Sequence, residues 1–300
     1  YMTNNEFKID KLVILGLGLI GGSLALAARK AGIVGEIVAW GRREPSLKTG
    51  LALGVIDSYS LDLEEALVGA AVVVVATPTQ TAEQVLTRVL SLVDPSCVVT
   101  DVASVKGNLL AGVKSAFENI PSNLVLGHPI AGSEKSGVNA AKDSLFVNHR
   151  VILTPTIETS IDALALIEKM WQATGADVVA MDVAKHDEVL AATSHLPHVL
   201  AYTLVGALAE KDNSDDIFEC AAGGFRDFTR IAASDPDMWT EIALANKDAL
   251  LDGMDDFSDA LAELRLAIAN SDGDSIRTTF KAAKKARDHF ATIQVQRGNK

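Results

Sequence analysis

The sequence predicts an α/β fold over residues 1–182, built on a parallel sheet, followed by an all-α domain over residues 183–300. Short apolar runs alternate with amphipathic helical patterns as far as Met181, and repeated β-α-β units of this kind imply a parallel sheet. A glycine-rich turn separates the first strand from the first helix. After Met181 only helical periodicity continues, so the domain boundary rests on this change of pattern.

The N-terminal elements follow one another in β-α order. The expected strands cover residues 11–15, 36–40, 71–76, 97–101, 124–127, 151–155 and 176–180, and the expected helices cover 23–31, 62–68, 81–92, 109–117 and 161–173. Open sheets of this class bind ligands beyond the carboxyl ends of their strands. We therefore expect one crevice lined by Gly16, Thr77, Ser104 and His128.

The helical part carries an apolar stripe whose members recur at steps of three and four residues or their sums: Trp239, Ile242, Leu250, Met254, Phe257, Leu261, Leu264 and Ile268. One continuous helix over this stretch would run roughly 45 Å. Its own small domain is too short to cover such a stripe, so a second subunit is the simplest cover. We expect a homodimer formed through the helical domain.

Composition excludes several classes of function. The 300 residues, 48% of them hydrophobic, fit two domains, and their formal charge of −12 repels nucleic acid and anionic membranes. The apolar run 66–76 is too short to span a bilayer, and the first residues lack the apolar segment of a secretory signal, so a cytoplasmic location is expected. Cys97 and Cys220 lie far apart without metal-ligand companions, which predicts two reduced, packed thiols and no metal site.

The first motif is the turn Gly16-x-Gly18-x-x-Gly21 between a strand and a helix. Its glycines permit a tight turn, close approach of a pyrophosphate and packing of the helix on the strand. The N-terminal part is therefore predicted to be a Rossmann-like dinucleotide-binding domain. The expected cofactor contacts are Gly16, Gly18, Leu19, Ile20, Gly21, Gly41, Arg42, Arg43, Thr77, Pro78 and Ser104.

The end of the second expected strand reads Gly41-Arg42-Arg43. NAD-specific domains usually place a carboxylate there to hold the ribose 2′-hydroxyl. Here no carboxylate repels a 2′-phosphate and two guanidiniums are available to bind it, so NADP is favoured, with NAD as an alternative or second cofactor. The alternative is that Arg42 and Arg43 are ordinary solvated surface residues.

Polar residues follow two further strands. Ser104 is placed to hydrogen-bond an alcohol or an imidazole, and Lys106 adds a local cation at the crevice; the alternative is that Ser104 caps the following helix. His128 follows a strand and precedes Pro129. An imidazole with a pKa near 6.5 can take a proton from an alcohol as hydride leaves its carbon. His128 is thus the candidate base of an alcohol oxidation, although a lone histidine is more often structural.

Ser194-His-Leu-Pro-His198 places two histidines on one helical face. Such a pair can hold a metal, but no acidic residue or cysteine stands nearby at ligand spacing. Substrate hydrogen bonding by His195 and His198 is the favoured interpretation.

Gly223-Gly-Phe-Arg-Asp-Phe-Thr-Arg230 breaks one helix and begins another. A guanidinium is the preferred partner of a carboxylate, which makes Arg230 a candidate substrate-binding residue. The alternative is an ion pair between Arg230 and Asp227 or Glu241.

Five blocks in this order resemble the prephenate/arogenate (cyclohexadienyl) dehydrogenases of tyrosine biosynthesis along nearly the whole chain. They are Gly-Leu-Gly-Leu-Ile-Gly-Gly-Ser (16–23), Asp-Val-Ala-Ser-Val-Lys (101–106), His-Pro-Ile-Ala-Gly-Ser-Glu-Lys-Ser-Gly (128–137), Ser-His-Leu-Pro-His (194–198) and Gly-Gly-Phe-Arg-Asp-Phe-Thr-Arg-Ile-Ala (223–232).

The resemblance implies NAD(P)-dependent oxidative decarboxylation of prephenate to 4-hydroxyphenylpyruvate, or of arogenate to tyrosine. It implies that His128 takes the proton of the ring C4 hydroxyl while C4 passes hydride to the nicotinamide and the C1 carboxylate leaves as carbon dioxide. Ser104 would orient His128, and Arg230 would hold a substrate carboxylate. The other substrate-binding residues implied are His198, His195, Ser133, Glu134, Asp227 and Trp239.

The chain departs from the family pattern in two places. Gly41 replaces the acidic residue of NAD-specific members, and the sequence ends at Lys300 without the regulatory module of some relatives, so tyrosine inhibition would act at the active site. The alternatives are a β-hydroxyacid dehydrogenase, which should carry a Lys-x-x-x-Asn helix, a pyrroline-carboxylate reductase, or a non-enzymatic NADP(H) sensor. Prephenate and arogenate are not separated by the sequence.

Overall fold

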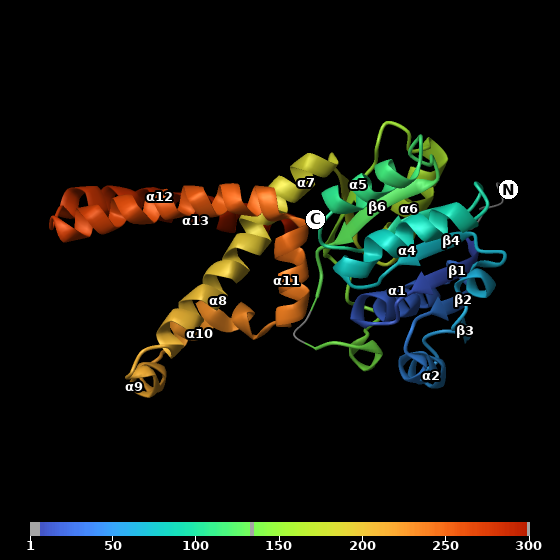
Figure 1. The fold of residues 1–300 in the computed structure, drawn as a ribbon, viewed down its shortest axis with the longest axis horizontal. Coiled ribbons are helices and arrows are strands. Elements are labelled where there is room, and N and C mark those ends of the chain that lie inside the picture. Colours follow the sequence, from blue (N-terminus) through green and yellow to red (C-terminus); the bar gives the residue numbers. More distant parts are fainter. Residues whose placement is uncertain (1–6, 133–134, 299–300) are drawn as a thin grey trace. The chain divides into compact units, whose positions relative to one another are not determined.

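The computed structural model describes residues 7–132 and 135–298 (Figure 1). The chain divides into two compact units, residues 1–247 and 248–300, which are described separately. The domain boundary predicted at 182/183 falls between the last strand and the first helix of the helical part of unit 1.

Unit 1 contains an eight-stranded sheet in the order β3-β2-β1-β4-β5-β6-β7-β8. The strands are β1 (Ile9–Leu15), β2 (Val34–Trp40), β3 (Ser58–Ser60), β4 (Val72–Val75), β5 (Val98–Asp101), β6 (Leu124–Pro129), β7 (Arg150–Thr154) and β8 (Asp177–Ala180). The strand order reverses direction between β1 and β4, and such a switch point opens a crevice for ligands at the carboxyl ends.

The prediction of a parallel sheet is wrong at one pair: β6 and β7 are antiparallel, with Leu126 opposite Thr154. The segment between them contains only the short 3-10 helix Val138–Ala140 among its described residues. A return without a crossover helix is compatible with an antiparallel pair, whereas parallel neighbours need a long crossover.

Helices cover both faces of the sheet (Figure 1). Their bounds are α1 (Leu19–Lys30), α2 (Glu44–Ala52), α3 (Leu63–Leu67), α4 (Thr79–Leu92), α5 (Gly107–Ala116) and α6 (Ile161–Ala173). One core layer joins α1, α2 and α6 to the sheet and the other joins α3, α4 and α5. Alternate residues of the central strands enter opposite layers: Val72 and Val74 pack on one face, Val73 and Val75 on the other. This burial on both faces explains the uninterrupted valine run.

Two elements escape sequence prediction. Helix α2 has a weak apolar pattern, with Leu47 and Gly50 as its buried residues. Strand β3 reads Ser-Tyr-Ser and lies at the edge of the sheet, where one side has no strand neighbour. Neither segment has the apolar periodicity from which the other elements were predicted.

The helical part of unit 1 consists of α7 (Val183–Leu190), α8 (Leu196–Ala209), α9 (Ser214–Glu219), α10 (Gly223–Thr229), a 3-10 turn (Arg230–Ala233) and α11 (Pro236–Ala245). A π-helical turn, Ala191–His195, joins α7 to α8, and Pro197 is the second residue of α8. Proline lacks the N–H that continues an α-helix and its ring clashes with the preceding turn, so a widened turn accommodates it.

The single long helix predicted along the apolar stripe is wrong. Helix α11 ends at Ala245, Asn246 adopts φ −111° and ψ 35°, and α12 (Lys247–Ala269) begins after it. Unit 2 contains the rest of α12 and helix α13 (Gly273–Gly298). In this single chain, several large apolar side chains of the unit are exposed: Leu251, Phe257, Leu261, Leu266, Ile268, Phe280 and Phe290. Across the described residues, no helix has the length and apolar content to cross a membrane.

Candidate functional site

The glycines of the turn between β1 and α1 serve different purposes. Gly16 has φ +103°, and a Cβ there would lie 2.5 Å from the carbonyl oxygen of Ala76. A Cβ at Gly21 would lie 2.3 Å from the carbonyl oxygen of Gly16, so α1 packs directly on the turn. Both positions therefore require glycine for the backbone to close.

At Gly18, packing does not demand glycine. A Cβ there would have no described atom within 4 Å. Gly18 is the N-cap residue of α1, no side chain caps the helix, and its first turn contains no acidic residue. The first N–H groups of α1 are thus open to an anion beside free space, which fits the pyrophosphate of a dinucleotide.

Arg42 and Arg43, after the end of β2, are both exposed. A Cβ at Gly41 would lie 3.5 Å from the side chain of Leu47, an ordinary contact. Packing therefore does not demand glycine at position 41, and its effect is to keep a side chain away from the segment that carries the two arginines.

The next residue, Glu44, is occupied by other partners. Its carboxylate pairs with Lys48 at 3.2 Å and accepts a hydrogen bond from the Tyr59 hydroxyl at 3.1 Å. The bonds from Lys48 and Tyr59 lower the pKa of Glu44. This carboxylate is tied to α2 and β3.

A buried ion pair fixes the loop after β5. Lys106 and Asp101, both fully buried, are paired, and the ammonium also donates to the carbonyl oxygen of Gly127 at 2.7 Å. Asp101 accepts from the N–H groups of Ala103 at 2.8 Å and Gly127 at 3.1 Å. The prediction that Lys106 is a cation at the crevice is wrong, because its charge is neutralised inside the protein, where it joins this loop to β6.

Ser104 lies half-buried in this loop, between the residues of the ion pair. The alternative that it caps α5 is wrong. The carboxylate of Asp187 accepts from the N–H of Lys106 at 2.9 Å and from that of Gly107 at 2.7 Å, so α7 supplies the cap. The Ser104 hydroxyl is thus not committed to the helix N-terminus.

Thr77 and Pro78 follow β4, the neighbour of β1 at the switch point. The Thr77 hydroxyl is buried and has no hydrogen-bond partner among the described residues. Pro78 is the N-cap residue of α4. A buried orphan hydroxyl beside the glycine turn is consistent with the predicted cofactor contacts.

His128 lies near the carboxyl end of β6 and is 8% exposed. Its Nδ1 lies 2.9 Å from Nε2 of His186 in α7. Burial holds the pKa of His128 well below its ordinary value, and His186, Lys106 and His195 lower it further. The imidazole is therefore neutral near pH 7, the form that a general base requires.

His186 is fully buried, and its Nδ1 lies 2.7 Å from Oδ1 of Asp187. Sequence reasoning missed both residues because they belong to no recognised block. A signal was present: an adjacent histidine and aspartate in the first helix after the sheet. Helix α7 packs against α5 and β7, which brings this pair to the edge where His128 lies.

His195, at the end of the π-helical turn, is 2% exposed. The Asn246 amide donates to its Nδ1 at 3.1 Å and to the carbonyl oxygen of Asp187 at 2.9 Å. Burial lowers the pKa of His195 to about 4, although the charge of Asp187 opposes the shift. His195 is therefore neutral, with its proton on Nε2. Asn246 was not predicted as a site residue.

His198, Trp239 and Arg230 form the next group. The His198 ring stacks on Trp239 with centroids 3.4 Å apart, and its Nδ1 donates to the carbonyl oxygen of Ser194 at 2.8 Å. Burial lowers the pKa of His198, and the nearby charge of Arg230 lowers it further. Neutral His198 thus keeps Nε2 as an acceptor, and the buried Nε1 of Trp239 has no described partner.

The remaining predicted substrate-binding residues are Ser133, Glu134 and Asp227. Ser133 and Glu134 lie outside the described residues. Asp227 is exposed, and its carboxylate lies 3.7 Å from the equally exposed Arg226. Glu241 accepts from the N–H of Gln80 at 2.9 Å, which joins α11 to the start of α4.

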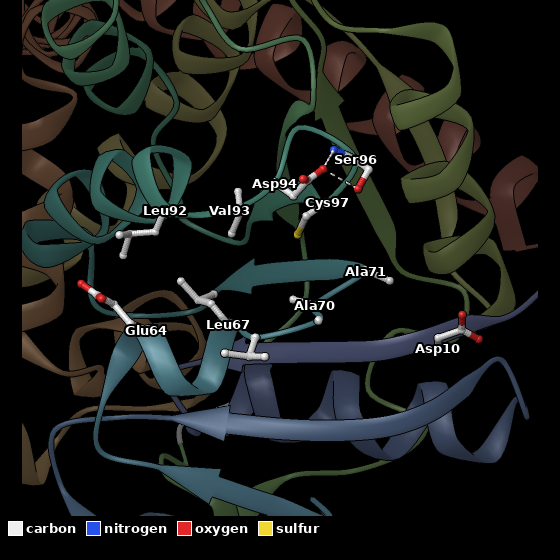
Figure 2. Close-up of a pocket in the computed structure, with 12 residues that line it drawn as sticks. Asp10, Glu64, Leu67, Ala70, Ala71, Leu92, Val93, Asp94, Ser96 and Cys97 are labelled. Atoms are coloured by element: carbon white, nitrogen blue, oxygen red, sulfur yellow. Dashed lines mark hydrogen bonds between the residues drawn. The ribbon is translucent and has the colours of Figure 1, made fainter.

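A hollow of about 550 Å³ lies at the amino ends of β4 and β5. Its lining residues are drawn in Figure 2. Cys97 lines the hollow, and burial, reinforced by the charge of Asp94, raises the pKa of the thiol to about 12, so the thiol is inert. Cys97 is packed as predicted, whereas Cys220 is exposed, contrary to prediction. Among the described residues, no cluster of histidine, cysteine or acidic side chains could hold a metal ion.

Comparison with known proteins agrees with this geometry. The nucleotide-binding domain of prephenate dehydrogenase matches residues 24–180, and the dimerization domain of prephenate dehydrogenase matches residues 182–282.

A cyclohexadienyl dehydrogenase of Zymomonas mobilis is 37% identical over 92% of this chain and 94% of its own length. A prephenate dehydrogenase of Bacillus subtilis is 38% identical over 95% of this chain and 76% of its own length. The crystal structure of the Aquifex aeolicus prephenate dehydrogenase with hydroxyphenyl propionate and NAD+ superposes with a TM-score of 0.88 at 32% identity, covering 95% of this chain and 100% of that chain. On these matches, the chain belongs to the prephenate dehydrogenase family.

Proposed function

We propose that this protein is a prephenate or arogenate dehydrogenase, which oxidises and decarboxylates a cyclohexadienyl substrate with NAD(P). The observation that carries the proposal is the neutral, buried His128 on a strand whose carboxyl end opens to the same sheet edge as the glycine turn. Family membership argues against the hydroxyacid dehydrogenase and pyrroline reductase alternatives.

The proposed reaction balances without a metal. Nε2 of His128 takes the proton of the ring C4 hydroxyl as the C4–H bond breaks, and the C–C bond to the C1 carboxylate breaks to release carbon dioxide and leave an aromatic ring. The turn between β1 and α1 would hold a nicotinamide dinucleotide, which would supply the acceptor for the hydride released from C4. Burial keeps His128 neutral near pH 7, and the neutral imidazole is the form that accepts the proton in the first step.

The remaining residues bind and orient the substrate. Ser104, whose hydroxyl is not used as a helix cap, orients the C4 hydroxyl against His128. Arg230 attracts a substrate carboxylate, and neutral His198 beside it offers Nε2 to the substrate side chain. His195 and Trp239 supply N–H donors from the same group, and Ser133, Glu134 and Asp227 stay predictions for this role.

For the cofactor, the proposal is that NADP is used at least as well as NAD. Arg42 and Arg43 are exposed beside Gly41, while Glu44 is engaged by Lys48 and Tyr59. Ratios of kcat/KM for the two cofactors test this, and a preference for NAD above about tenfold, or 1.4 kcal/mol, would refute it. Gly41→Asp should move the ratio toward NAD, because its carboxylate repels a 2′-phosphate.

His128→Asn tests the base. We expect kcat to fall by about 10²-fold or more, with substrate and cofactor dissociation constants within a few-fold, since a general base acts in the reaction and not in binding. Exposed His149→Gln is the control. Near-normal kcat in His128→Asn would exclude this base. Tight NADPH binding without turnover of either substrate by the unmodified protein would favour the sensor alternative.

The proposal includes a homodimer formed through the helical domain, a cytoplasmic location, and inhibition by tyrosine, where it occurs, at the active site. The dimer is supported by the match to a dimerization domain and by the exposed apolar residues of unit 2. Sedimentation of the full chain tests it.

A further inference from the structure

Three elements of unit 1 meet in one continuous chain of hydrogen bonds. The first N–H groups of α5 reach the Asp187 carboxylate, whose Oδ1 lies 2.7 Å from Nδ1 of His186. Nε2 of His186 lies 2.9 Å from Nδ1 of His128, and the two rings are edge-on at 63°. His128 and His186 are buried, and the side chain of Asp187 is nearly so. The chain thus connects a helix N-terminus to the candidate base.

The chemistry of the partners fixes the direction of each bond. Backbone N–H groups only donate, so the Asp187 carboxylate accepts from α5. An ionised carboxylate only accepts, so Nδ1 of His186 carries a proton. With a single ring proton, His186 then offers its other nitrogen as an acceptor, and Nδ1 of His128 donates to it. The lone pair of His128 is left on Nε2.

We propose that His186 and Asp187 are positioning residues that hold His128 in the tautomer with its proton on Nδ1 and its basic lone pair on Nε2. This inference rests on the proposed function, in which His128 is the base. It assigns an active-site role to two residues that lie outside the glycine turn and outside every one of the five sequence blocks. A carboxylate that orients a catalytic imidazole acts in the same way in hydrolase triads, here with one imidazole in between.

The same hydrogen bonds stabilise the imidazolium that forms when His128 accepts a proton. The new imidazolium donates from Nδ1 to His186, and the Asp187 charge lies one imidazole further along. In the part of the chain that the structure describes, the groups that act electrostatically on His128 are His186 from α7, His195 from the π-helical turn, and Lys106 before α5, whose charge Asp101 neutralises. Lys106 neutralises Asp101, so its charge does not neutralise Asp187. Asp187 is linked to His128 through His186.

The tautomer can be measured without reference to catalysis. The full-length protein labelled with ¹⁵N-histidine is examined near pH 7 by long-range ¹H–¹⁵N correlation, and His128→Asn identifies the signals of His128. We expect a protonated Nδ1 and an unprotonated Nε2. A proton on Nε2 of His128, or an even mixture of tautomers, would overturn the proposal regardless of the kinetics.

A matched pair of variants tests the acceptor. His186→Leu keeps a side chain of similar size but removes the acceptor, whereas His186→Gln places an amide oxygen near the position of Nε2. In His186→Leu we expect kcat to fall roughly 10- to 100-fold, the range seen when the partner that orients a functional histidine is lost. KM should stay within about threefold, and His186→Gln should recover most of kcat. A purely structural role would make both variants lose thermal stability and activity alike.

Lys185→Ala is the control on the same helix, because Lys185 is exposed and pairs with Glu188 at 2.9 Å on the surface. It should leave kcat unchanged. Normal kcat in His128→Asn would refute the proposed base, whereas a large loss in His128→Asn with normal kcat in His186→Leu would refute the positioning role alone.

Discussion

Gly18→Ala should weaken cofactor binding and Gly21→Ala should lower the stability of the fold, although the two glycines belong to one turn. A Cβ at position 18 meets no described atom within 4 Å, while a Cβ at position 21 meets the Gly16 carbonyl oxygen at 2.3 Å and Ile14 Cγ2 at 2.9 Å. The first substitution fills the free space beside the start of α1. The second forces the turn and the helix apart.

The magnitudes follow from these contacts. Gly18→Ala keeps an extended conformation, φ −103° and ψ −156°, so the free energy of unfolding should change by less than about 1 kcal/mol. The methyl group stands where a pyrophosphate would approach, and the cofactor Kd should rise at least about tenfold, or 1.4 kcal/mol. Gly21→Ala overpacks backbone against backbone, which costs typically about 1–3 kcal/mol and lowers Tm by roughly 2–4 °C for each kcal/mol.

Calorimetric titration with NADPH and with NADH gives the Kd, and thermal unfolding without cofactor gives Tm. Leu53→Ala, at an exposed position after α2, is a neutral control. Unchanged binding of both cofactors by Gly18→Ala would show that the pyrophosphate does not approach this position. A normal Tm for Gly21→Ala would show that the turn can move enough to accommodate a Cβ at this position.

Three further predictions concern charge. Arg230→Ala should weaken substrate binding by about 2–4 kcal/mol, read from KM, because Arg230, which is exposed in this single chain, would lose a carboxylate that bound substrate buries against it. Arg226→Ala, at another exposed position, should leave KM unchanged, and equal KM values in the two variants would return Arg230 to a structural role. Lys106→Met should destabilise the protein by about 3–5 kcal/mol in urea unfolding, since it leaves Asp101 buried and unpaired, and adding Asp101→Asn should restore part of the loss; no recovery would contradict the charge argument. His195 has a pKa of about 4 in the folded protein and an ordinary pKa near 6.5 in the unfolded chain. Below about pH 6.5 the unfolded chain therefore binds a proton that the folded protein does not. The free energy of unfolding should fall by about 2 kcal/mol between about pH 7 and pH 5. Urea unfolding at the two pH values should show a shallower loss in His195→Gln than in the unmodified protein, and parallel losses would refute the assignment.

The sequence predicted the sheet well because its signals are local. Apolar runs such as 72–75 and the glycine turn carry their geometry in adjacent residues, and the resulting strands were placed to within a few positions. The strand β7 was predicted, but its antiparallel direction was not. The direction of pairing depends on the route of the connection between two strands, and an apolar run predicts a strand without indicating its direction. Helix α6 was predicted at its observed bounds, Ile161–Ala173, since its apolar face has the full helical period.

The sequence predicted a site residue only where the residue type and its position relative to a strand together indicate a chemical role. His128 follows a strand, so its place at the sheet edge could be inferred; whether it is neutral depends on burial and on His186, some 58 positions away in the chain. Lys106 shows the opposite case. A lysine beside a motif reads as a ligand-binding cation, but the buried Asp101 on the preceding strand pairs with it, and no periodicity in the sequence reveals that pairing.

The break at Asn246 shows how the site overrides local helical propensity. Apolar periodicity continues through this position, and a continuous helix would satisfy the pattern of the stripe. Instead the helix is interrupted, and the Asn246 amide uses both of its donors, on the Asp187 carbonyl oxygen and on Nδ1 of His195. The first bond holds the backbone of the residue that anchors His186, and the second fixes the tautomer of His195. A single asparagine therefore joins the two groups of histidines at the candidate site, and the local cost of ending one helix and starting another is offset by two buried hydrogen bonds.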